Sequence, residues 1–564
     1  MSQSFARLVF AVTAAFFAAF FLWPVLQILR GGFIDADGRF TLAYLGALLS
    51  DPLYLGALGN SLLIAGAATT LALLLALPLA VVSDRHAFPA KSLLGSLVLI
   101  PMILPPFVGA IGIKQIFGQY GAFNALLHHL HLLAPGATID WFATNQFWGI
   151  AVVEALSLYP IIYLNALAAL ANVDPAMEEA AQNLGCTGLR RFVRITLPLI
   201  RPGLFAGGTI VFIWAFTELG TPLIFDYDRV TSVQIYYGLR DIGGNPFPYA
   251  LVAVMLGASV ALYAVGKELF GRAGHAMMAK ATSAAAPRPL SPVRAWLCTA
   301  LFAGVTFVAV LPHLGVILVA FSCDWYGTVI PHAYTLANFR LALGHDLTVP
   351  AIANSLKFAS VATLIDLVLG VAIAYVVVRT RLAGRAVLDF LAMLPLAVPG
   401  LVLAFGYLAM AQEGRAFAFL NPVQNPTVLL IIAYSVRRLP YVVRSAAAGF
   451  EQTSVTLEEA AQNLGAPPLR SVVRVTLPLI AANLIAGGLL AFAFAMLEVS
   501  DSLILAQKQL YYPITKAIME LFQLLGDGKF LASALGVWAM VFLGVIIAGL
   551  SVLLGKKLGA IFRV

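Results

Sequence analysis

Two glutamates at equivalent places of two apolar segments are the first residues of this sequence that could do chemistry. Glu218 stands in FIWAFTELGTPLIF (212–225) and Glu498 in FAFAMLEVSDSLIL (492–505), and these segments align residue for residue. An ionisable side chain in hydrocarbon is costly and usually faces a pathway or a partner. The two carboxylates could therefore line a path or gate for a solute, or they could be held in a buried hydrogen bond or salt bridge.

Other charged residues in apolar segments have no charged counterpart. Glu154 and Asp366 align with uncharged residues, and so do Arg437 and Arg438. This asymmetry would suit an unsymmetrical solute, but an ion pair between Glu154 and one of the two arginines is the simpler interpretation, and we prefer it. The candidates for a path or gate are thus Glu218, Glu498, Glu154, Asp366, Arg437 and Arg438.

Long apolar stretches carry these charged residues. The chain has 564 residues, of which 61% are hydrophobic and 11% charged, whereas soluble domains have roughly 25% charged residues. A helix needs about 20 apolar residues to cross a bilayer. About twelve stretches qualify, near 8–29, 57–82, 92–113, 147–171, 203–225, 249–270, 295–321, 354–378, 387–411, 427–449, 481–505 and 531–555. The predicted fold class is an all-α integral membrane protein.

The basic residues predict an orientation. The net charge is +8, and most of the 34 lysines and arginines fall in alternate loops. Cytoplasmic loops carry such an excess, so both termini are predicted to be cytoplasmic. A basic membrane protein needs no nucleic acid to explain its charge. The three cysteines do not suggest a disulfide framework.

The second part of the chain repeats the first. ILPPFVGAIG (103–112) corresponds to LAVPGLVLAFG (396–406). The third and ninth spans are expected to bend at the prolines in and just before these segments, which are Pro101, Pro105, Pro106, Pro395 and Pro399. Each half then has six spans, so both halves enter the membrane in the same orientation, and a pathway is expected between them. The predicted parts are a first half at 1–270, a cytoplasmic linker at 271–294 and a second half at 295–564.

The octapeptide EEAAQNLG occurs in a cytoplasmic loop of each half, at 178–185 and at 458–465. Gly185 and Gly465 end the two copies, where a helix can stop with φ > 0. An ordinary amphipathic loop would keep only a pattern of polar and apolar residues, whereas here eight side chains agree. Two identical short helices predict a partner with two identical surfaces, because a helix in a groove is a common recognition mode.

The residues before each octapeptide suggest where its helix begins. Asp174 and Pro175 precede the first copy as an expected N-cap and first helical residue. In the second copy, Thr456 and Glu459 have the spacing of a capping box. Acidic side chains in the first turns also favour these helix starts.

A longer pattern around each octapeptide, E-A-A-x3-G-x9-I-x-L-P, carries a family resemblance. The first copy matches it at Glu179, Ala180, Ala181, Gly185, Ile195, Leu197 and Pro198. The second copy, with Val475 in place of Ile, matches it at Glu459, Ala460, Ala461, Gly465, Leu477 and Pro478. The chain thus resembles the permease subunits of binding-protein-dependent ABC importers over nearly its whole length. Its fused halves resemble the iron(III)-type group.

The resemblance implies the type I ABC importer permease fold, with two parallel six-helix repeats. It implies a coupling helix in each half, in loops at about 172–202 and 452–482, that docks into an ATPase subunit. The residues expected at this contact are Glu178, Glu179, Ala180, Ala181, Gly185, Glu458, Glu459, Ala460, Ala461 and Gly465. Two ATPase copies would drive alternating access, and a periplasmic or lipid-anchored binding protein would deliver the solute.

The chain itself carries no recognisable motor. It has no G-x-x-x-x-G-K-[ST] segment, so we expect no enzymatic activity and no cofactor on this chain, with ATP and Mg²⁺ on the partner ATPases. The expected location is the bacterial inner membrane, as a multi-pass protein in contact with lipid. An ion-coupled secondary transporter is the alternative class, but it would have no use for twin coupling loops.

The solute follows from the resemblance and not from the charges in the spans. Iron(III) is favoured, and the alternatives are 2-aminoethylphosphonate, another organophosphate, or thiamine. The intramembrane acids would suit a cation and the arginines an anion. His128, His129 and His131 could suggest a metal site, yet iron(III) prefers oxygen ligands. We predict an outer amphipathic helix there, at the membrane surface, and no resident metal.

Overall fold

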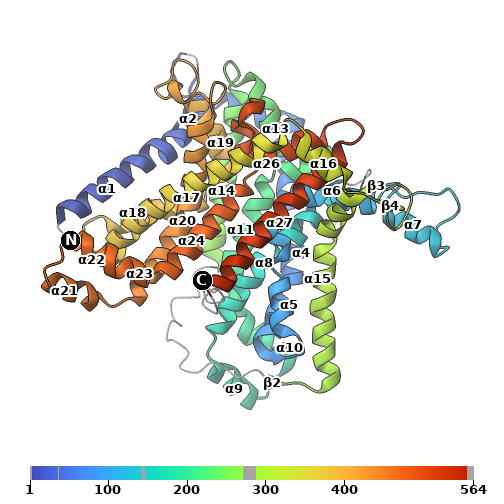
Figure 1. Cartoon of the computed structure of the whole chain (residues 1–564), viewed down its shortest axis with the longest axis horizontal. Helices are drawn as coiled ribbons and strands as arrows, with labels where there is room; N and C mark the ends of the chain where they lie inside the picture. Colours follow the sequence, from blue (N-terminus) through green and yellow to red (C-terminus); the bar gives the residue numbers. More distant parts are fainter. Residues whose placement is uncertain (1–2, 36, 143–145, 271–287, 555–564) are drawn as a thin grey trace.

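The computed structural model describes residues 3–35, 37–142, 146–270 and 288–554. Helices make up most of this part of the chain (Figure 1), as the apolar stretches predict. Two short strand pairs accompany them: β1 (His86–Ala87) with β2 (Arg288–Pro289), and β3 (Ser322–Asp324) with β4 (Ala333–Tyr334). Most of the predicted linker, residues 271–287, lies outside the described residues, and the boundaries of the two halves remain predictions.

The helices follow one another in the same order in both halves. Those of the first half are α1 (Gln3–Phe17), η1 (Ala18–Leu22), α2 (Trp23–Phe33), α3 (Ala43–Ser50), α4 (Pro52–Arg85), α5 (Lys91–Leu97), η2 (Ile100–Ile103), α6 (Pro106–Phe117), α7 (Ala122–His129), α8 (Gln146–Ala171), α9 (Pro175–Asn183), α10 (Gly188–Arg191), η3 (Phe192–Thr196), α11 (Leu197–Thr217), α12 (Gly220–Ile224), α13 (Thr231–Gly238), η4 (Leu239–Asp241) and α14 (Phe247–Phe270). Those of the second half are α15 (Pro292–Phe321), α16 (Ala337–Gly344), α17 (Thr348–Arg379), α18 (Arg385–Met393), η6 (Leu394–Leu396), α19 (Gly400–Met410), η7 (Ala418–Leu420), α20 (Thr427–Gln452), α21 (Val455–Asn463), α22 (Pro468–Ser471), η8 (Val472–Thr476), α23 (Leu477–Leu479), α24 (Ala481–Met496), α25 (Ser500–Leu505), η9 (Gln509–Tyr511), α26 (Ile514–Phe522) and α27 (Gly528–Leu554).

The membrane spans agree with the predicted stretches. Within the described ranges, eight helices are long and apolar enough to cross a bilayer, or up to eleven if three sharply bent pairs each count as one span. The one predicted stretch outside these eleven is the tenth, 427–449, which coincides with α20 and carries Arg437, Arg438 and Arg444. These three charges make α20 the least apolar of the predicted spans, and it packs on α17 and α24 with most of its residues buried.

Two of the bends lie where prolines predict them. Lys91–Ile103 meets Pro106–His129 at 96°, and Arg385–Leu396 meets Gly400–Met410 at 101°. Proline removes a backbone donor and clashes with the preceding turn, so a helix breaks there. The predicted bends of the third and ninth spans are therefore confirmed. They give the two halves equivalent broken spans.

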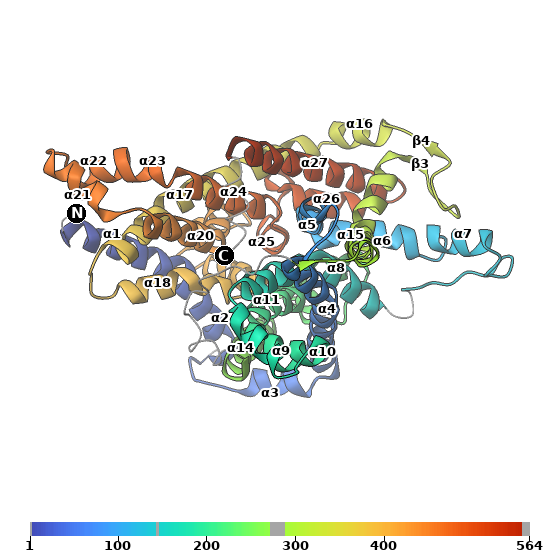
Figure 2. The ribbon, with the colours of Figure 1, turned by 90° about the horizontal axis from the view of Figure 1, so that it is seen from below.

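Two equivalent helix bundles form the core of the molecule. In one, α4 packs against α8 and α11, and in the other α17 packs against α20 and α24. Figure 2 shows these bundles side by side, with the short helices α9 and α21 at separate corners. Figure 1 shows both short helices at the end of the molecule away from α13 and α26.

The first span of each half packs on the bent span of the other half. Helix α15 lies against α6, and α2 lies against α19. Equivalent glycines permit both contacts: a Cβ at Gly112 would lie 2.2 Å from the carbonyl oxygen of Pro312, and one at Gly406 would lie 2.9 Å from Pro24. The two halves are thus joined by two equivalent contacts, α15 with α6 and α2 with α19.

Candidate translocation cavity and coupling loops

The repeated octapeptides form two short helices whose ends match most of the expectations. Asp174 caps α9 by accepting a hydrogen bond from the backbone N–H of Ala176 at 2.9 Å, as predicted. The predicted capping box of the second copy is wrong, because Ser454 and not Thr456 is the N-cap of α21. The N-cap must precede the first helical turn, and α21 already begins at Val455.

The glycine after each short helix has the predicted left-handed conformation. Gly185 has φ +79° and Gly465 has φ +90°. The chain then forms α10 or α22 and a single π-helical turn, η3 or η8. Such turns are rare and often occur at functional sites. Their recurrence at equivalent positions shows that the two loops share their backbone shape as well as their sequence.

Apolar side chains are exposed at equivalent places of both loops. Leu184 is 87% exposed and Leu464 is 90% exposed. Met177 of the first loop and its equivalent Leu457 of the second are also exposed. The same holds for Leu189 and its equivalent Leu469. Clustered exposed apolar residues mark contact surfaces. Each loop therefore presents the same apolar surface, defined by Met177, Leu184 and Leu189 or by Leu457, Leu464 and Leu469.

The two glutamates of each octapeptide face in different directions. Glu178 pairs with Arg85 and accepts a hydrogen bond from the Thr196 hydroxyl at 2.6 Å. Glu458 pairs with Arg379 at 3.3 Å, and the Thr476 hydroxyl donates to it at 3.0 Å. These inward contacts tie each short helix to the end of α4 or α17.

Glu179 and Glu459 are exposed beside the apolar surfaces. Ala180 and Ala460 are exposed as well, whereas Ala181 is buried and Ala461 half-buried. The candidate coupling residues thus divide into an outer set that a partner can reach and an inner set that holds the loop on the membrane bundle. Glu178 and Glu458 belong to the inner set.

The duplicated ion pair leads to a prediction about stability. The Arg379–Glu458 side chains are 7% and 4% exposed, against 18% and 16% for Arg85 and Glu178. Breaking a buried pair by removing one partner costs about 3–5 kcal/mol. Arg379→Ala should therefore lower the melting temperature of the purified permease more than Arg85→Ala, as measured by intrinsic tryptophan fluorescence. Equal melting temperatures for the two variants would contradict this.

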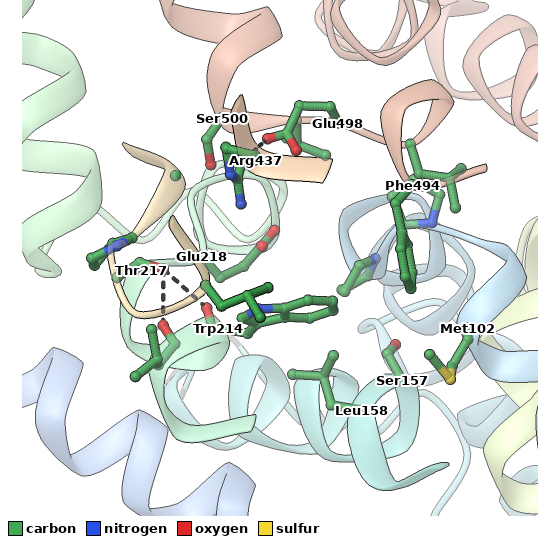
Figure 3. Close-up of a pocket in the computed structure, with 18 of the residues that line it drawn as sticks. Met102, Ser157, Leu158, Trp214, Thr217, Glu218, Arg437, Phe494, Glu498 and Ser500 are labelled. Carbon is green, nitrogen blue, oxygen red and sulfur yellow. Dashed lines mark hydrogen bonds and ion pairs between the residues drawn. The ribbon is translucent and has the colours of Figure 1, made fainter. Parts of the chain in front are cut away.

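A cavity of about 150 Å³ lies between the two halves, bounded by both bent spans. Figure 3 shows side chains from α8, α11, α20 and α24 turned toward it. Five of the six path or gate candidates line this cavity, namely Glu154, Glu218, Arg437, Arg438 and Glu498. The sixth, Asp366, does not: it is fully buried in α17 and accepts a hydrogen bond from Ser435 at 2.6 Å.

Glu498 is held between two arginines. Arg437 Nη1 donates to Glu498 Oε1 at 2.5 Å, and Arg438 pairs with the other carboxylate oxygen. Asp501, which is fully buried, lies 3.4 Å from the same Arg437 nitrogen. Gly400 permits this arrangement, because a Cβ there would lie 2.1 Å from the Arg437 guanidinium.

The preferred ion pair of Glu154 with Arg437 or Arg438 is therefore wrong. Both arginines extend from α20 toward the loop after α24 in their own half, where Glu498 is nearer. The contribution of Asp501 was missed. A signal for it exists: Asp501 aligns with Thr221, so the second half gains an acid where it also gains arginines.

Glu218 has a different environment from its counterpart. Its Oε1 accepts hydrogen bonds from the backbone N–H groups of Gly220 at 3.1 Å and Thr221 at 3.2 Å. The carboxylate thus accepts from two backbone N–H groups in the first turn of α12, which have no partner within the helix. Glu154 lies near it on α8, is 1% exposed, and has one oxygen, Oε1, without a hydrogen-bond partner in the described chain.

The histidine cluster lies at the end of a short outer helix. His128 and His129 close α7, and His131 follows it with a positive φ of 54°. His128 Nε2 is 2.8 Å from the carbonyl oxygen of Ala137. A backbone contact of this kind orders the loop, and in the residues described no group of three or more His, Cys, Asp or Glu could hold a metal ion.

Comparison with known proteins identifies the family. The family model for the inner membrane component of binding-protein-dependent transport systems matches residues 68–326 and 366–554. A protein of Haemophilus influenzae named as a ferric transport system permease is 26% identical over 498 residues, covering 85% of this chain and 75% of the relative. A ferric transport system permease of Actinobacillus pleuropneumoniae is 26% identical over 495 residues, covering 85% and 69%.

A further relative matches one half only. The protein of Salmonella typhimurium named as a 2-aminoethylphosphonate transport system permease is 26% identical over 247 residues, covering 43% of this chain and 85% of the relative. The family model, in contrast, spans most of both halves. The chain belongs to the inner membrane components of binding-protein-dependent transport systems, the permeases of ABC importers.

Proposed function

We propose that this chain supplies both halves of the translocation path of an importer driven by two copies of one ATPase. The observation that carries this proposal is the equivalence of the two cytoplasmic loops: the same octapeptide, the same glycine conformation, and the same exposed apolar residues such as Leu184 and Leu464. One kind of ATPase subunit can dock on both. ATP and Mg²⁺ belong to these partners, and alternating access moves the solute through the cavity.

The proposed orientation places the coupling loops and both termini in the cytoplasm of a bacterial cell, with the permease in the inner membrane. The charge distribution supports it, because cytoplasmic loops carry the excess of lysine and arginine. A binding protein then delivers the solute on the side of α13 and α26, which lies opposite α9 and α21 (Figure 1).

The proposed solute is iron(III). Two relatives that cover both halves are named as ferric permeases, whereas the 2-aminoethylphosphonate relative covers one half. The cavity agrees with this choice, because Arg437 and Arg438 are already paired with Glu498. An anionic phosphonate would have to displace that carboxylate.

Uptake by reconstituted vesicles tests the function and the solute together. The permease, its ATPase and its binding protein are placed in proteoliposomes, and uptake of ⁵⁵Fe³⁺, 2-aminoethylphosphonate and thiamine is compared with and without ATP. We expect ATP-dependent uptake of iron alone. Uptake of the phosphonate in place of iron would overturn the proposed solute. Uptake that continues without ATP would overturn the proposal that the chain belongs to an ATP-driven importer.

A further inference from the structure

The two sides of the cavity differ in how their charges are compensated. On the side of the second half, Glu498 and Asp501 lie beside Arg437 and Arg438. Two acids and two bases lie together here, and each arginine already has a carboxylate partner. Buried ion pairs of this kind hold their partners strongly, because separating them leaves an uncompensated charge. This side is therefore a poor receptor for a further ion.

The side of the first half has acids without basic partners. Neither Glu154 nor Glu218 forms an ion pair with a lysine, arginine or histidine of the described residues. Thr221 connects them: its hydroxyl lies 3.4 Å from Glu218 Oε1, and it also contacts the Glu154 carboxyl. The sequence explains the difference, because the residues of the first half that align with Arg437 and Arg438 are Ser157 and Leu158.

Glu154 provides the free ligand atom. The residue is 1% exposed, lines the cavity, and has a buried Oε1 atom with no hydrogen-bond partner in the described chain. A buried polar atom without a partner is costly, so a native protein retains one where something else supplies the partner. The cavity of about 150 Å³ has room for an ion and several waters, since one water occupies about 30 Å³ of liquid.

We propose that Glu154 and Glu218 form a transient site for a hard trivalent cation in the path. This inference rests on the proposed function, because it assumes that the cavity is part of the path. Carboxylate oxygens suit hard cations, and two ionised acids near each other in a medium of low dielectric repel each other, which a bound cation would relieve. Two protein ligands with remaining waters also hold an ion weakly enough for release, which conduction requires.

Luminescence of Tb³⁺ tests this site directly. Trp214 lines the cavity near Glu218 (Figure 3), so Tb³⁺ bound there can be excited through its indole. The complete complex of permease, ATPase and binding protein in nanodiscs is titrated with Tb³⁺ while tryptophan is excited. We expect saturable emission that Fe³⁺ competes away and that Trp214→Phe removes.

The Glu154→Gln/Glu218→Gln double variant should bind Tb³⁺ at least about tenfold more weakly, equivalent to about 1.4 kcal/mol. The affinity of each single variant should lie between that of the unmodified chain and that of the double variant. Glu413→Gln, the same chemical change at an exposed outer residue, is the matched control and should bind as the unmodified chain does. ATP hydrolysis by each variant complex checks folding. Unchanged Tb³⁺ affinity in a folded double variant would overturn the site.

The two proposals fail in different ways. If the unmodified complex takes up ⁵⁵Fe³⁺ and the double variant takes it up equally well, the carboxylate site is wrong and the function stands. If the unmodified complex takes up no iron yet binds Tb³⁺ through Glu154 and Glu218, the proposed solute is wrong and the cation site stands.

Discussion

The Leu184→Asp/Leu464→Asp double variant is expected to lose ATP-driven uptake while the permease itself remains folded. Both leucines are almost fully exposed on the two equivalent loops, so a charge there costs the isolated chain little. In a docked complex each would lie in an apolar contact with an ATPase subunit, and a central apolar contact residue is worth 2 kcal/mol or more, about 30-fold in affinity.

The measurement is uptake by proteoliposomes together with pull-down of the ATPase by the permease. Leu525→Asp is the matched control for the pull-down, because Leu525 is 99% exposed on the loop between α26 and α27, away from both coupling loops. Each single variant should keep one docked ATPase. Capture of the ATPase by the double variant equal to that by Leu525→Asp would show that these leucines do not face the ATPase.

The second large effect is expected for Glu498→Ala. This carboxylate is 4% exposed and holds both Arg437 and Arg438. Its removal leaves two buried guanidinium groups with Asp501 as the remaining acid, and breaking a buried pair costs about 3–5 kcal/mol. The thermal stability of the purified permease should fall sharply, as measured by fluorescence-detected size-exclusion chromatography after heating.

Glu218→Ala is the internal control for that effect. Glu218 aligns with Glu498 but receives hydrogen bonds from the backbone of Gly220 and Thr221, and an unsatisfied buried donor costs about 1–3 kcal/mol. The melting temperature of the Glu218→Ala variant should therefore fall less than that of the Glu498→Ala variant. An equal or larger loss for Glu218→Ala would contradict the assignment of the charge cluster to the second half alone.

Much of the architecture could be predicted from the repeat. Pro105, Pro106 and Pro399 lie at the breaks of the two bent spans, because proline acts locally on the backbone. Gly185 and Gly465 end the short helices for an equally local reason. Glu218 and Glu498 line one cavity because equivalent positions of parallel repeats meet around the axis between them.

Pairing inside the membrane could not be predicted from spacing. Arg437 and Arg438 are adjacent on α20, and which acid they meet depends on how α20 is rotated against the loop after α24. From the sequence alone, Glu154 is the favoured partner, and Asp501 is not among the candidates. The structure selects Glu498 and Asp501.

Neighbouring residues of the octapeptide were also indistinguishable by sequence. Glu178 and Glu179 are adjacent, and adjacent helical side chains point in different directions. Both glutamates were assigned to the ATPase contact, but Glu178 turns inward to Arg85 and Glu179 is exposed. The partner of Glu178 is Arg85, the last residue of α4. A contact between residues so far apart in the sequence cannot be predicted from their spacing.

The number of ATPase subunits held by one chain tests the central claim most directly. Native mass spectrometry of the complex released from nanodiscs, with the 60.0 kDa permease as reference mass, counts them. Two equivalent coupling loops predict one permease chain with two identical ATPase copies, and one copy for the Leu464→Asp variant. A complex with a single ATPase in the unmodified protein, or a permease that transports its solute with none bound, would contradict it.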